Sequence, residues 1–360
     1  MTEEKYMGLA IELAQRGCGR VNPNPMVGAV IVKDGAVIGQ GWHEYYGGLH
    51  AERNAIANCS CDPRGAVMYV TLEPCCHYGK TPPCTQAIIE SGIKKVVVGS
   101  FDPNPLVSGK GIETLQKAGV EVQTGCMTEE CDRINEVFFH YIKNKIPFVV
   151  MKYAMTMDGK TATRTGASKW ISGEQSRHNV HHSRHRYMGI MVGVGTVLAD
   201  DPMLNCRLEN GKDPIRIICD TKLKTPLNSK VINTAGQIQT IIATASNDEQ
   251  RCEEYQKTGC KILKVKEKDG SVDLNQLMEE LGELGIDSIL LEGGSTLNYS
   301  ALQAGIVNKI QVYIAPKLFG GANAKSPIGG LGVQLPEQAF KVKNMKITAI
   351  GEDFLLEGDL

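Results

Sequence analysis

The amino-acid sequence predicts a two-domain protein of the α/β class, in which strands alternate with helices along both halves of the chain. Its 360 residues exceed what a single hydrophobic core usually serves. Short apolar runs rich in valine and isoleucine alternate with amphipathic stretches of helical period. The segment Lys145-Ile-Pro147 follows a long helical stretch and precedes a new apolar run, so we place the domains at residues 1–145 and 146–360.

The first domain is expected to carry helices on both faces of one sheet. An amphipathic helix over residues 3–16 stops at Gly17, and residues 26–32 and 37–41 form a hairpin that turns at Asp34-Gly35. The elements expected after the hairpin are a helix at 51–58, a strand at 67–71, a helix from about 85, a strand at 93–99, a helix at 111–118, a strand at 120–123 and one long helix at 129–143.

The second domain is expected to form another, largely parallel sheet, because strand–helix units repeat through it. It begins with a strand at Phe148, followed by a helix from Gly173 to about Tyr187. The tail from Lys341 to Leu360 adds one or two last strands. Further strands are expected at 190–193, 215–219, 238–243, 262–265, 288–291 and 310–314, with helices such as 274–284 between several of them.

Composition excludes several protein classes. A hydrophobic content of 42% and a charged content of 22% are typical of soluble globular proteins. The net charge of −1 gives no global basic bias, which disfavours nucleic acid as a partner. No uncharged apolar run reaches the ~18 residues of a membrane span, and the N-terminus lacks the pattern of a signal peptide. We therefore expect a cytoplasmic protein whose twelve cysteines are reduced or bound to metal.

The most informative motif joins His50-Ala-Glu52 to the loop Thr71-Leu-Glu-Pro-Cys75-Cys-His-Tyr-Gly-Lys-Thr-Pro-Pro-Cys84. An imidazole and two thiolates fill three places around zinc, and catalytic zinc keeps the fourth place for water. A carboxylate two residues from the histidine can carry the protons of that water. H-x-E followed by P-C-x-x-C is a signature of zinc deaminases acting on nucleobases. We therefore predict His50, Cys75 and Cys84 as metal ligands and Glu52 as the catalytic residue.

The spacing departs from that signature, because eight residues rather than two separate Cys75 from Cys84. Cys76 and His77 lie inside the loop, so a closed Cys3His zinc knuckle that uses Cys76 is the alternative. We favour Cys84, because Pro82-Pro83 restricts its approach and the next residues predict a helix, whose N-terminus stabilises a thiolate. A knuckle would also leave the carboxylate of Glu52 unexplained.

Other polar residues lie near strand ends, where α/β sheets place ligand-binding groups. Each of Asn24, His43, Lys80, Asp102 and Asn104 taken singly suits turn chemistry or a solvated charge. Together with the zinc motif, they suggest a pocket.

Two glycine motifs in the second half suggest a dinucleotide. Gly193-Val-Gly195-Thr196 follows an apolar strand but lacks the third glycine of G-x-G-x-x-G, so it is weak alone. Glu292-Gly-Gly-Ser-Thr296 runs from a strand into a helix and presents backbone N–H groups to a phosphate. The alternative is a plain strand–helix turn with a hydroxyl cap.

These segments resemble a known family, the bifunctional deaminase/reductase of riboflavin biosynthesis. In the first half the resemblance lies in Asn22-Pro-Asn-Pro-Met-Val-Gly-Ala-Val, His50-Ala-Glu, the cysteine loop with its eight-residue gap, and Asp102-Pro-Asn-Pro-Leu-Val. In the second half it lies in residues 152–160, Ser168-Lys-Trp170, residues 192–202, Asp220-Thr221 and Glu292-Gly-Gly-Ser.

The resemblance implies a cytidine-deaminase-like three-layer domain followed by a dihydrofolate-reductase-like α/β domain. The first would be the zinc-dependent deaminase of 2,5-diamino-6-ribosylamino-4(3H)-pyrimidinone 5′-phosphate. The residues implied to hold this ribotide are Asn24, His43, Lys80, Asp102 and Asn104.

The second domain would use NADPH to reduce the ribosyl group of 5-amino-6-ribosylaminouracil 5′-phosphate to a ribityl chain. The residues implied to contact NADPH are Ala154, Trp170, Thr196, Asp200, Thr221, Gly294, Ser295, Thr296, Leu297, Asn298, Tyr299 and Ser300. Those implied to hold the substrate are Ser168, Arg184, Leu204, Arg207 and Glu292. The two arginines suit a phosphate, which a guanidinium group binds through two hydrogen bonds. The resemblance also implies a homo-oligomer.

Three alternatives stay open at this point. The pairs His178/His182 and His181/His185 have helical metal-ligand spacing, although a solvated basic face explains them better. A zinc deaminase acting on tRNA or another nucleic acid, with a degenerate second domain, is disfavoured by the near-neutral charge. In a third interpretation the zinc only braces a nucleotide-sensing module.

Overall fold

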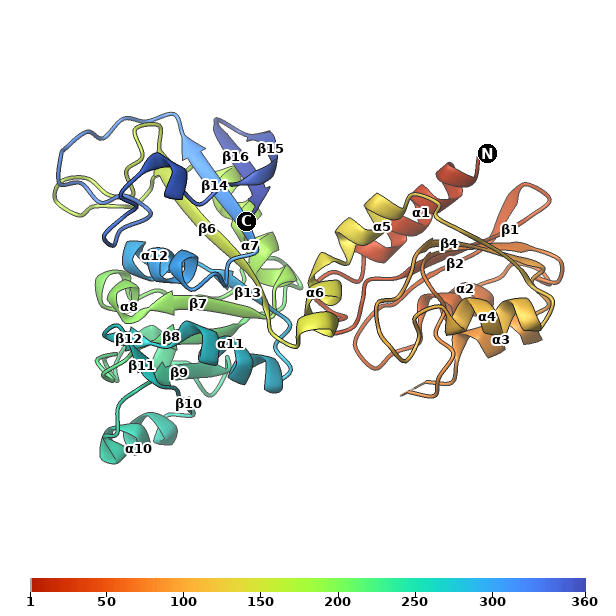
Figure 1. Cartoon of the computed structure of the whole chain (residues 1–360), viewed down its shortest axis with the longest axis horizontal. Coiled ribbons are helices and arrows are strands. Elements are labelled where there is room, and N and C mark those ends of the chain that lie inside the picture. The colour runs from red at the N-terminus through yellow and green to blue at the C-terminus, as the bar shows by residue number, and fades with distance from the viewer. Residues whose placement is uncertain (1, 80) are drawn as a thin grey trace. The chain divides into compact units, whose positions relative to one another are not determined.

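The computed structural model describes residues 2–79 and 81–360 and divides into two compact units, Met1–Lys145 and Ile146–Leu360. Each unit has its own sheet and its own core (Figure 1). In the described part of the chain, no helix is both long and apolar enough to cross a bilayer.

The first unit is built on a five-stranded sheet in the order β2-β1-β3-β4-β5. Strand β1 is antiparallel to β2 and β3, whereas β3, β4 and β5 are parallel. The strands are β1 (Gly28–Lys33), β2 (Ala36–Trp42), β3 (Val67–Leu72), β4 (Lys95–Ser100) and β5 (Glu121–Thr124). The helices are α1 (Glu3–Gln15), α2 (Ala51–Ala57), α3 (Cys84–Glu90), α4 (Lys110–Lys117), α5 (Thr128–Ile134) and α6 (Glu136–Asn144).

Helices cover both faces of this sheet, as the alternation of buried residues predicts. Ala29 and Ile31 of β1 pack in the same core cluster as residues of α2, α3 and α4. Val30, between them, faces the opposite side and packs with residues of α1 and α5. The expected three layers are therefore confirmed, and α2 and α3 lie on the same face of the sheet (Figure 1).

The prediction of one long helix over 129–143 was wrong, because the chain breaks at Asn135 into α5 and α6. The buried Asn135 side chain accepts a hydrogen bond from the Met26 backbone N–H at 2.8 Å and donates one to the Met26 carbonyl at 3.0 Å. An asparagine side chain that pairs with a distant backbone competes with the helical pattern. The break thus ties the end of the unit to the segment that precedes β1.

The second unit contains a nine-stranded sheet in the order β10-β9-β8-β7-β13-β6-β14-β16-β15. All neighbours from β10 to β14 are parallel, and the C-terminal hairpin β15–β16 adds antiparallel strands at one edge. The strands of this sheet are β6 (Phe148–Thr156), β7 (Gly189–Gly193), β8 (Ile215–Cys219), β9 (Thr240–Thr244), β10 (Lys261–Lys264), β13 (Ser288–Leu291), β14 (Lys309–Ala315), β15 (Lys343–Ile350) and β16 (Asp353–Asp359).

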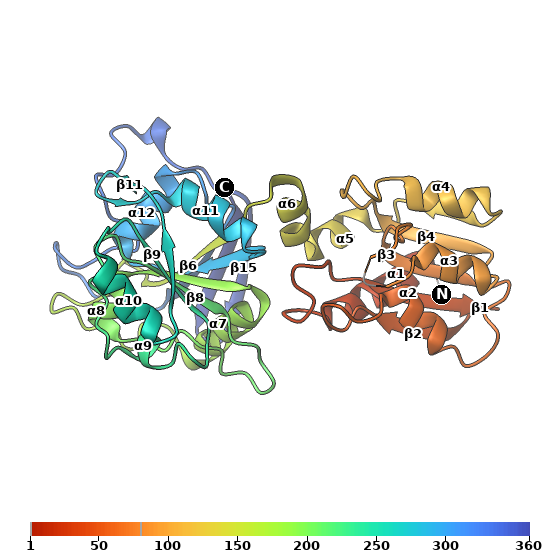
Figure 2. The same ribbon diagram turned by 90° about the horizontal axis from the view of Figure 1, so that it is seen from below.

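Helices again cover both faces of the sheet. Helices α11 and α12 pack on one face, and α8, α9 and α10 pack on the other (Figure 2). The short helix α9 and the hairpin β11–β12 were not predicted from the sequence. The helices are α7 (Glu174–Arg186), α8 (Val194–Asp200), α9 (Lys230–Asn233), α10 (Glu249–Lys257), α11 (Leu274–Glu283) and α12 (Ser295–Gln303), and the small hairpin is β11 (Glu267–Lys268) with β12 (Ser271–Val272).

Candidate active sites

Three metal-ligating side chains converge in the first unit. The ligand atoms of His50, Cys75 and Cys84 all lie within 4.8 Å of one another. The Nδ1 atom of His50 is 3.5 Å from the Cys75 sulfur and 3.4 Å from the Cys84 sulfur. One imidazole and two thiolates at these separations fit a zinc ion and leave one tetrahedral position free.

Helix termini position these ligands. His50 is the N-cap of α2, and Cys84 is the first residue of α3 after Pro83. Both helices therefore direct the positive ends of their dipoles at the ligand cluster, which favours thiolate over thiol. The Arg53 side chain donates hydrogen bonds to the carbonyl groups of Pro82 and Pro83, at 3.1 and 2.8 Å, and so fixes the approach to Cys84.

Cys76 does not join this cluster. Its sulfur lies 3.8 Å from the Leu106 carbonyl oxygen, and the only cluster of three or more potential metal ligands in the described part of the chain is the one at His50. The closed Cys3His alternative is therefore absent from the described residues.

Hydrogen bonds and burial shift the pKa values of the groups in and beside this cluster. A hydrogen bond with Cys84 lowers the pKa of the Cys75 thiol, against the effect of burial, and His50 adds to the lowering. Burial raises the pKa of Glu52 to about 6, and the neighbouring Cys75 contributes in the same direction. The Glu52 carboxyl group is thus held in the apolar interior beside the ligands.

A cavity of about 250 Å³ opens beside the cluster. Its wall brings together four of the predicted substrate-binding residues with two of the metal ligands and Glu52, while Cys84 lies buried behind it. Lys80, the fifth predicted residue, lies outside the described residues. The predicted residues on the wall are Asn24, His43, His50, Glu52, Cys75, Asp102 and Asn104.

Two of these residues form a fixed hydrogen-bonded pair. The Nδ1 atom of His43 donates to the Leu49 carbonyl at 3.0 Å, so its Nε2 atom accepts from the Asn24 amide at 3.1 Å. Burial lowers the pKa of His43, and this keeps the ring neutral. The remaining Asn24 carbonyl oxygen is a candidate acceptor for a ring amine in the cavity.

Glu73, to which no role was assigned from the sequence, organises the opposite wall of the cavity. Its carboxylate accepts hydrogen bonds from the backbone N–H groups of Gly109, Gly111 and Ile112 at 3.0, 3.0 and 3.3 Å. This anchors the loop that carries Asp102 and the start of α4. Burial raises the pKa of Asp102 to about 6, with Glu73 and Cys75 adding to the effect. In the sequence, the one feature that could have pointed to Glu73 is its position in the cysteine-loop motif, two residues before Cys75.

The second unit contains a larger cavity of about 670 Å³ at the carboxyl ends of β6, β7, β8 and β13. Both glycine motifs lie on it, since Gly193 caps α8 and Gly294 caps α12. The expected run from strand β13 into a helix is therefore confirmed. The predicted residues that line this cavity are Ser168, Thr196, Asp200, Thr221, Glu292, Gly294, Ser295, Thr296, Leu297, Asn298 and Ser300.

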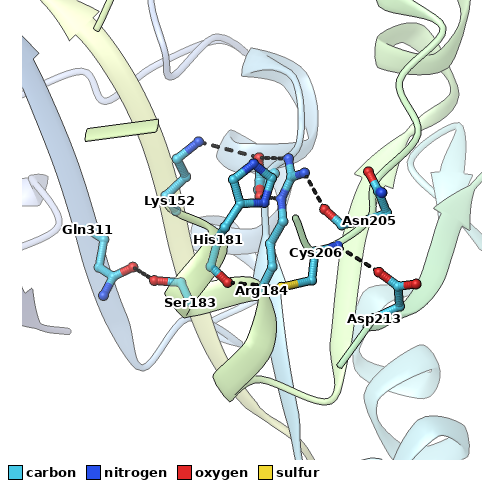
Figure 3. A network of polar contacts seen from close by, with 9 residues as sticks. Lys152, His181, Ser183, Arg184, Asn205, Cys206, Asp213 and Gln311 are labelled. Carbon is cyan, nitrogen blue, oxygen red and sulfur yellow. Dashed lines mark hydrogen bonds and ion pairs between the residues drawn. The ribbon is translucent and has the colours of Figure 1, made fainter. Parts of the chain in front are cut away.

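Glu292 joins the cavity to a buried ion-pair network. Arg184 contacts both of its carboxylate oxygens, with Nε at 2.7 Å and Nη2 at 3.0 Å, and Lys152 Nζ lies at 3.3 Å. Burial alone would raise the pKa of Glu292, but the two cations outweigh burial and hold it far below the usual value. The same arginine donates to the Asn205 carbonyl at 2.9 Å (Figure 3).

Several other predicted residues do not line the cavity. Arg184 contacts the Glu292 carboxylate, and Leu204 is buried in the core beneath α8. Trp170 is exposed, with the Arg177 guanidinium 4.7 Å from its ring centre, and the Tyr299 hydroxyl donates to the Gly332 carbonyl. Ala154 packs beside Val180 and Tyr313, and Arg207 is exposed.

The histidines of α7 form no cluster of three or more metal ligands among the described residues. The rings of His178 and His182 stack edge to face, with centres 5.1 Å apart. His185 accepts a hydrogen bond from the Lys212 backbone N–H at 2.9 Å. Burial lowers the pKa of His181 to about 4, and the positive charge of Arg184 adds to the effect.

Comparison with known proteins extends the resemblance over the whole chain. A family model described as the RibD C-terminal domain matches residues 147–356, and one described as the cytidine and deoxycytidylate deaminase zinc-binding region matches residues 1–100. The riboflavin biosynthesis protein RibD of Actinobacillus pleuropneumoniae is 56% identical over 99% of this chain and 95% of its own length. The RibD protein of Escherichia coli K12 is 38% identical over 99% of both chains.

Solved structures agree with these matches. RibD of Acinetobacter baumannii superposes with a TM-score of 0.88 at 35% identity, over 99% of this chain and 98% of that one. A diaminohydroxyphosphoribosylaminopyrimidine deaminase/5-amino-6-(5-phosphoribosylamino)uracil reductase from Thermotoga maritima gives a TM-score of 0.86 at 40% identity, with the same coverage. The matches give no support to a nucleic-acid deaminase.

Proposed function

The chain belongs to the RibD family and is a bifunctional deaminase and reductase of riboflavin biosynthesis, and we propose how its two units divide the work. Residues 1–145 deaminate 2,5-diamino-6-ribosylamino-4(3H)-pyrimidinone 5′-phosphate. Residues 146–360 then reduce the ribosyl group of 5-amino-6-ribosylaminouracil 5′-phosphate to a ribityl chain, with NADPH as the hydride donor.

The observation that carries the deaminase assignment is the convergence of His50, Cys75 and Cys84 beside a cavity that Glu52 also lines. Zinc held by these three ligands would supply Lewis acidity at the cavity wall. The Glu52 carboxylate takes a proton from the attacking water and delivers it to the departing amine nitrogen, so the proton count balances as ammonia leaves. Asn24, oriented by His43, holds the pyrimidine ring.

The opposite wall completes this pocket. Asp102 and Asn104 lie on the loop that Glu73 anchors, and the Asp102 carboxylate already accepts the Asn104 backbone N–H at 2.8 Å. A loop fixed in this way presents polar groups to the substrate with little loss of conformational entropy on binding.

The reductase assignment rests on the 670 Å³ cavity and on the helix that begins at Gly294. NADPH would supply the hydride chemistry. Backbone N–H groups at the start of α12 bind the cofactor's pyrophosphate, and Ser168 and Glu292 hold the sugar. Arg184 and Lys152 keep Glu292 ionised and fixed in position.

Incubation of the zinc-loaded full chain with the diaminopyrimidine ribotide, with and without NADPH, tests both halves by mass spectrometry. Without NADPH we expect exchange of a ring amine for oxygen and release of ammonia. With NADPH the product also gains a hydride and a proton. An unchanged ribotide would refute the deaminase half, and a deaminated but never reduced product would refute the reductase half. Ammonia release from single-stranded nucleic acid would favour the alternative.

We also propose that the enzyme works as a homo-oligomer in the cytoplasm. None of the twelve cysteines forms a disulfide, which fits a reducing compartment. Light scattering of the purified chain measures the oligomeric state.

A further inference from the structure

The turn that follows β8 presents two lysines to the larger cavity. Lys222 and Lys224 line it together with Thr221, at the carboxyl end of the strand. Both lysines are exposed, and neither ammonium group has a hydrogen-bond or ion-pair partner among the described residues. The larger cavity therefore has two unneutralised cations on one wall.

The backbone of this turn is held from several sides. The Asp220 carboxylate accepts the backbone N–H groups of Lys224 at 2.9 Å and Thr225 at 2.7 Å. The Tyr255 hydroxyl donates to the Thr225 carbonyl at 2.5 Å, and the Thr244 hydroxyl donates to the Thr221 carbonyl at 3.1 Å. The two lysine side chains thus start from a fixed frame.

The same contacts occupy the carboxylate of Asp220, so this acid cannot accept a hydrogen bond from the 2′-hydroxyl of an unphosphorylated ribose. In dinucleotide-binding folds, an acidic residue that accepts from the ribose 2′-hydroxyl favours NAD. Asp220 is fully buried and its oxygens are occupied by Lys224 and Thr225, including the Thr225 hydroxyl at 2.7 Å. Of the other acids on the cavity wall, Glu292 is neutralised by Arg184 and Lys152, and Asp200 alone opposes the two lysines.

The position of the turn fits the adenosine end of a dinucleotide. Strand β7 separates β8 from β13, so the turn and the start of α12 lie about 10 Å apart across the strand ends, given the usual strand spacing. With the pyrophosphate at α12, the adenosine ribose reaches toward β8, away from Glu292 and Ser168. The β11–β12 hairpin borders the same cavity through Gly270 and Ser271.

We propose that Lys222 and Lys224 bind the 2′-phosphate of a phosphorylated nicotinamide dinucleotide and so set the preference for NADPH over NADH. This inference rests on the proposed reductase function and adds its cofactor specificity. The lysines act through charge at an exposed wall, so the preference decreases as ionic strength rises.

The test compares Lys222→Ala/Lys224→Ala with a matched control, Lys261→Ala/Lys346→Ala, which removes two exposed lysines that do not line the cavity. Reductase kcat/KM is measured with NADPH and with NADH in the full chain. Calorimetry with 2′,5′-ADP and with 5′-AMP measures the phosphate contribution without turnover. We expect the cavity variant to lose at least about tenfold in kcat/KM for NADPH and in affinity for 2′,5′-ADP, which corresponds to ~1.4 kcal/mol. Values for NADH and 5′-AMP stay unchanged, and the control matches the wild type.

The outcomes separate the inference from the function on which it rests. A wild-type enzyme that prefers NADPH, with the preference intact in the cavity variant, would overturn the role of the lysines and leave the reductase standing. Equal use of NADH and NADPH by the wild type would do the same. Failure of the wild type to use either cofactor would overturn both.

Discussion

Removing Arg184 should destabilise the second unit, because Glu292 would lose its principal counter-charge in a buried site. The two side chains are only 13% and 11% exposed, and they are joined by two short hydrogen bonds. Breaking a buried ion pair by removing one partner costs about 3–5 kcal/mol. Because Lys152 remains 3.3 Å from the carboxylate, we expect Arg184→Met to cost about 3 kcal/mol, the lower end of that range.

The assay is urea unfolding of the full chain at neutral pH in a Trp42→Phe background. Trp170 is then the only tryptophan, and it reports on the second unit alone. Arg177→Met on the same helix is the matched control, since that arginine is half-buried and stacks on Trp170. We expect the control to cost about 1 kcal/mol, and Glu292→Gln to recover part of the loss in the Arg184→Met background.

The pKa shift of Glu292 fixes the direction in which the stability of the second unit changes with pH. The folded-state pKa of Glu292 is depressed, so its stabilising contribution is present above the ordinary glutamate pKa of about 4.3 and is lost as the pH falls toward the depressed value. The cost of Arg184→Met should therefore be largest at neutral pH and shrink below about pH 4. A free-energy cost no larger than that of Arg177→Met, or strict additivity with Glu292→Gln, would show that Arg184 and Glu292 do not form a stabilising buried ion pair.

Three further predictions concern the first unit. Glu52→Gln should retain zinc and lower deamination by about two to four orders of magnitude, with reductase activity as the internal control; retained turnover with bound zinc would remove the role of Glu52. Chelation of zinc should abolish deamination and leave NADPH-dependent reduction of the deaminated ribotide unchanged, as measured by NADPH absorbance; a parallel loss of both would contradict two independent sites. Gly28→Ala should destabilise the unit by about 1–3 kcal/mol in thermal unfolding, because an added Cβ collides with the Ala10 carbonyl oxygen of α1, whereas Gly8→Ala meets no neighbour and should stabilise that helix by about 1 kcal/mol.

Much of the fold followed from local patterns. The strand at Val67 and the helix at Cys84 had clear signals, since a β-branched apolar run leads into a loop that a proline pair closes. The break at Asn135 had none, because its cause is a hydrogen-bonded contact with Met26, 109 residues away. Single-sequence periodicity contains no information about such a partner.

The candidate sites also contain some features that the local sequence predicts and others that depend on contacts made only after folding. The residue types His50, Cys75 and Cys84 indicated a metal site although their spacing departs from the deaminase signature, and the structure brings their ligand atoms together. The anchoring by Glu73 and the burial of Asp220 depend on which backbone N–H groups meet a carboxylate after folding. Sequence alone gives the acid but not the direction in which it points.

X-ray absorption at the zinc edge of the full chain tests the open metal site most directly. We expect two sulfur ligands at about 2.3 Å, one imidazole nitrogen and one light atom from solvent, with a sulfur lost in Cys84→Ser but not in Cys76→Ser. Three sulfur ligands in the wild type, or a sulfur lost in Cys76→Ser, would mean an enclosed structural zinc and would contradict the deaminase mechanism.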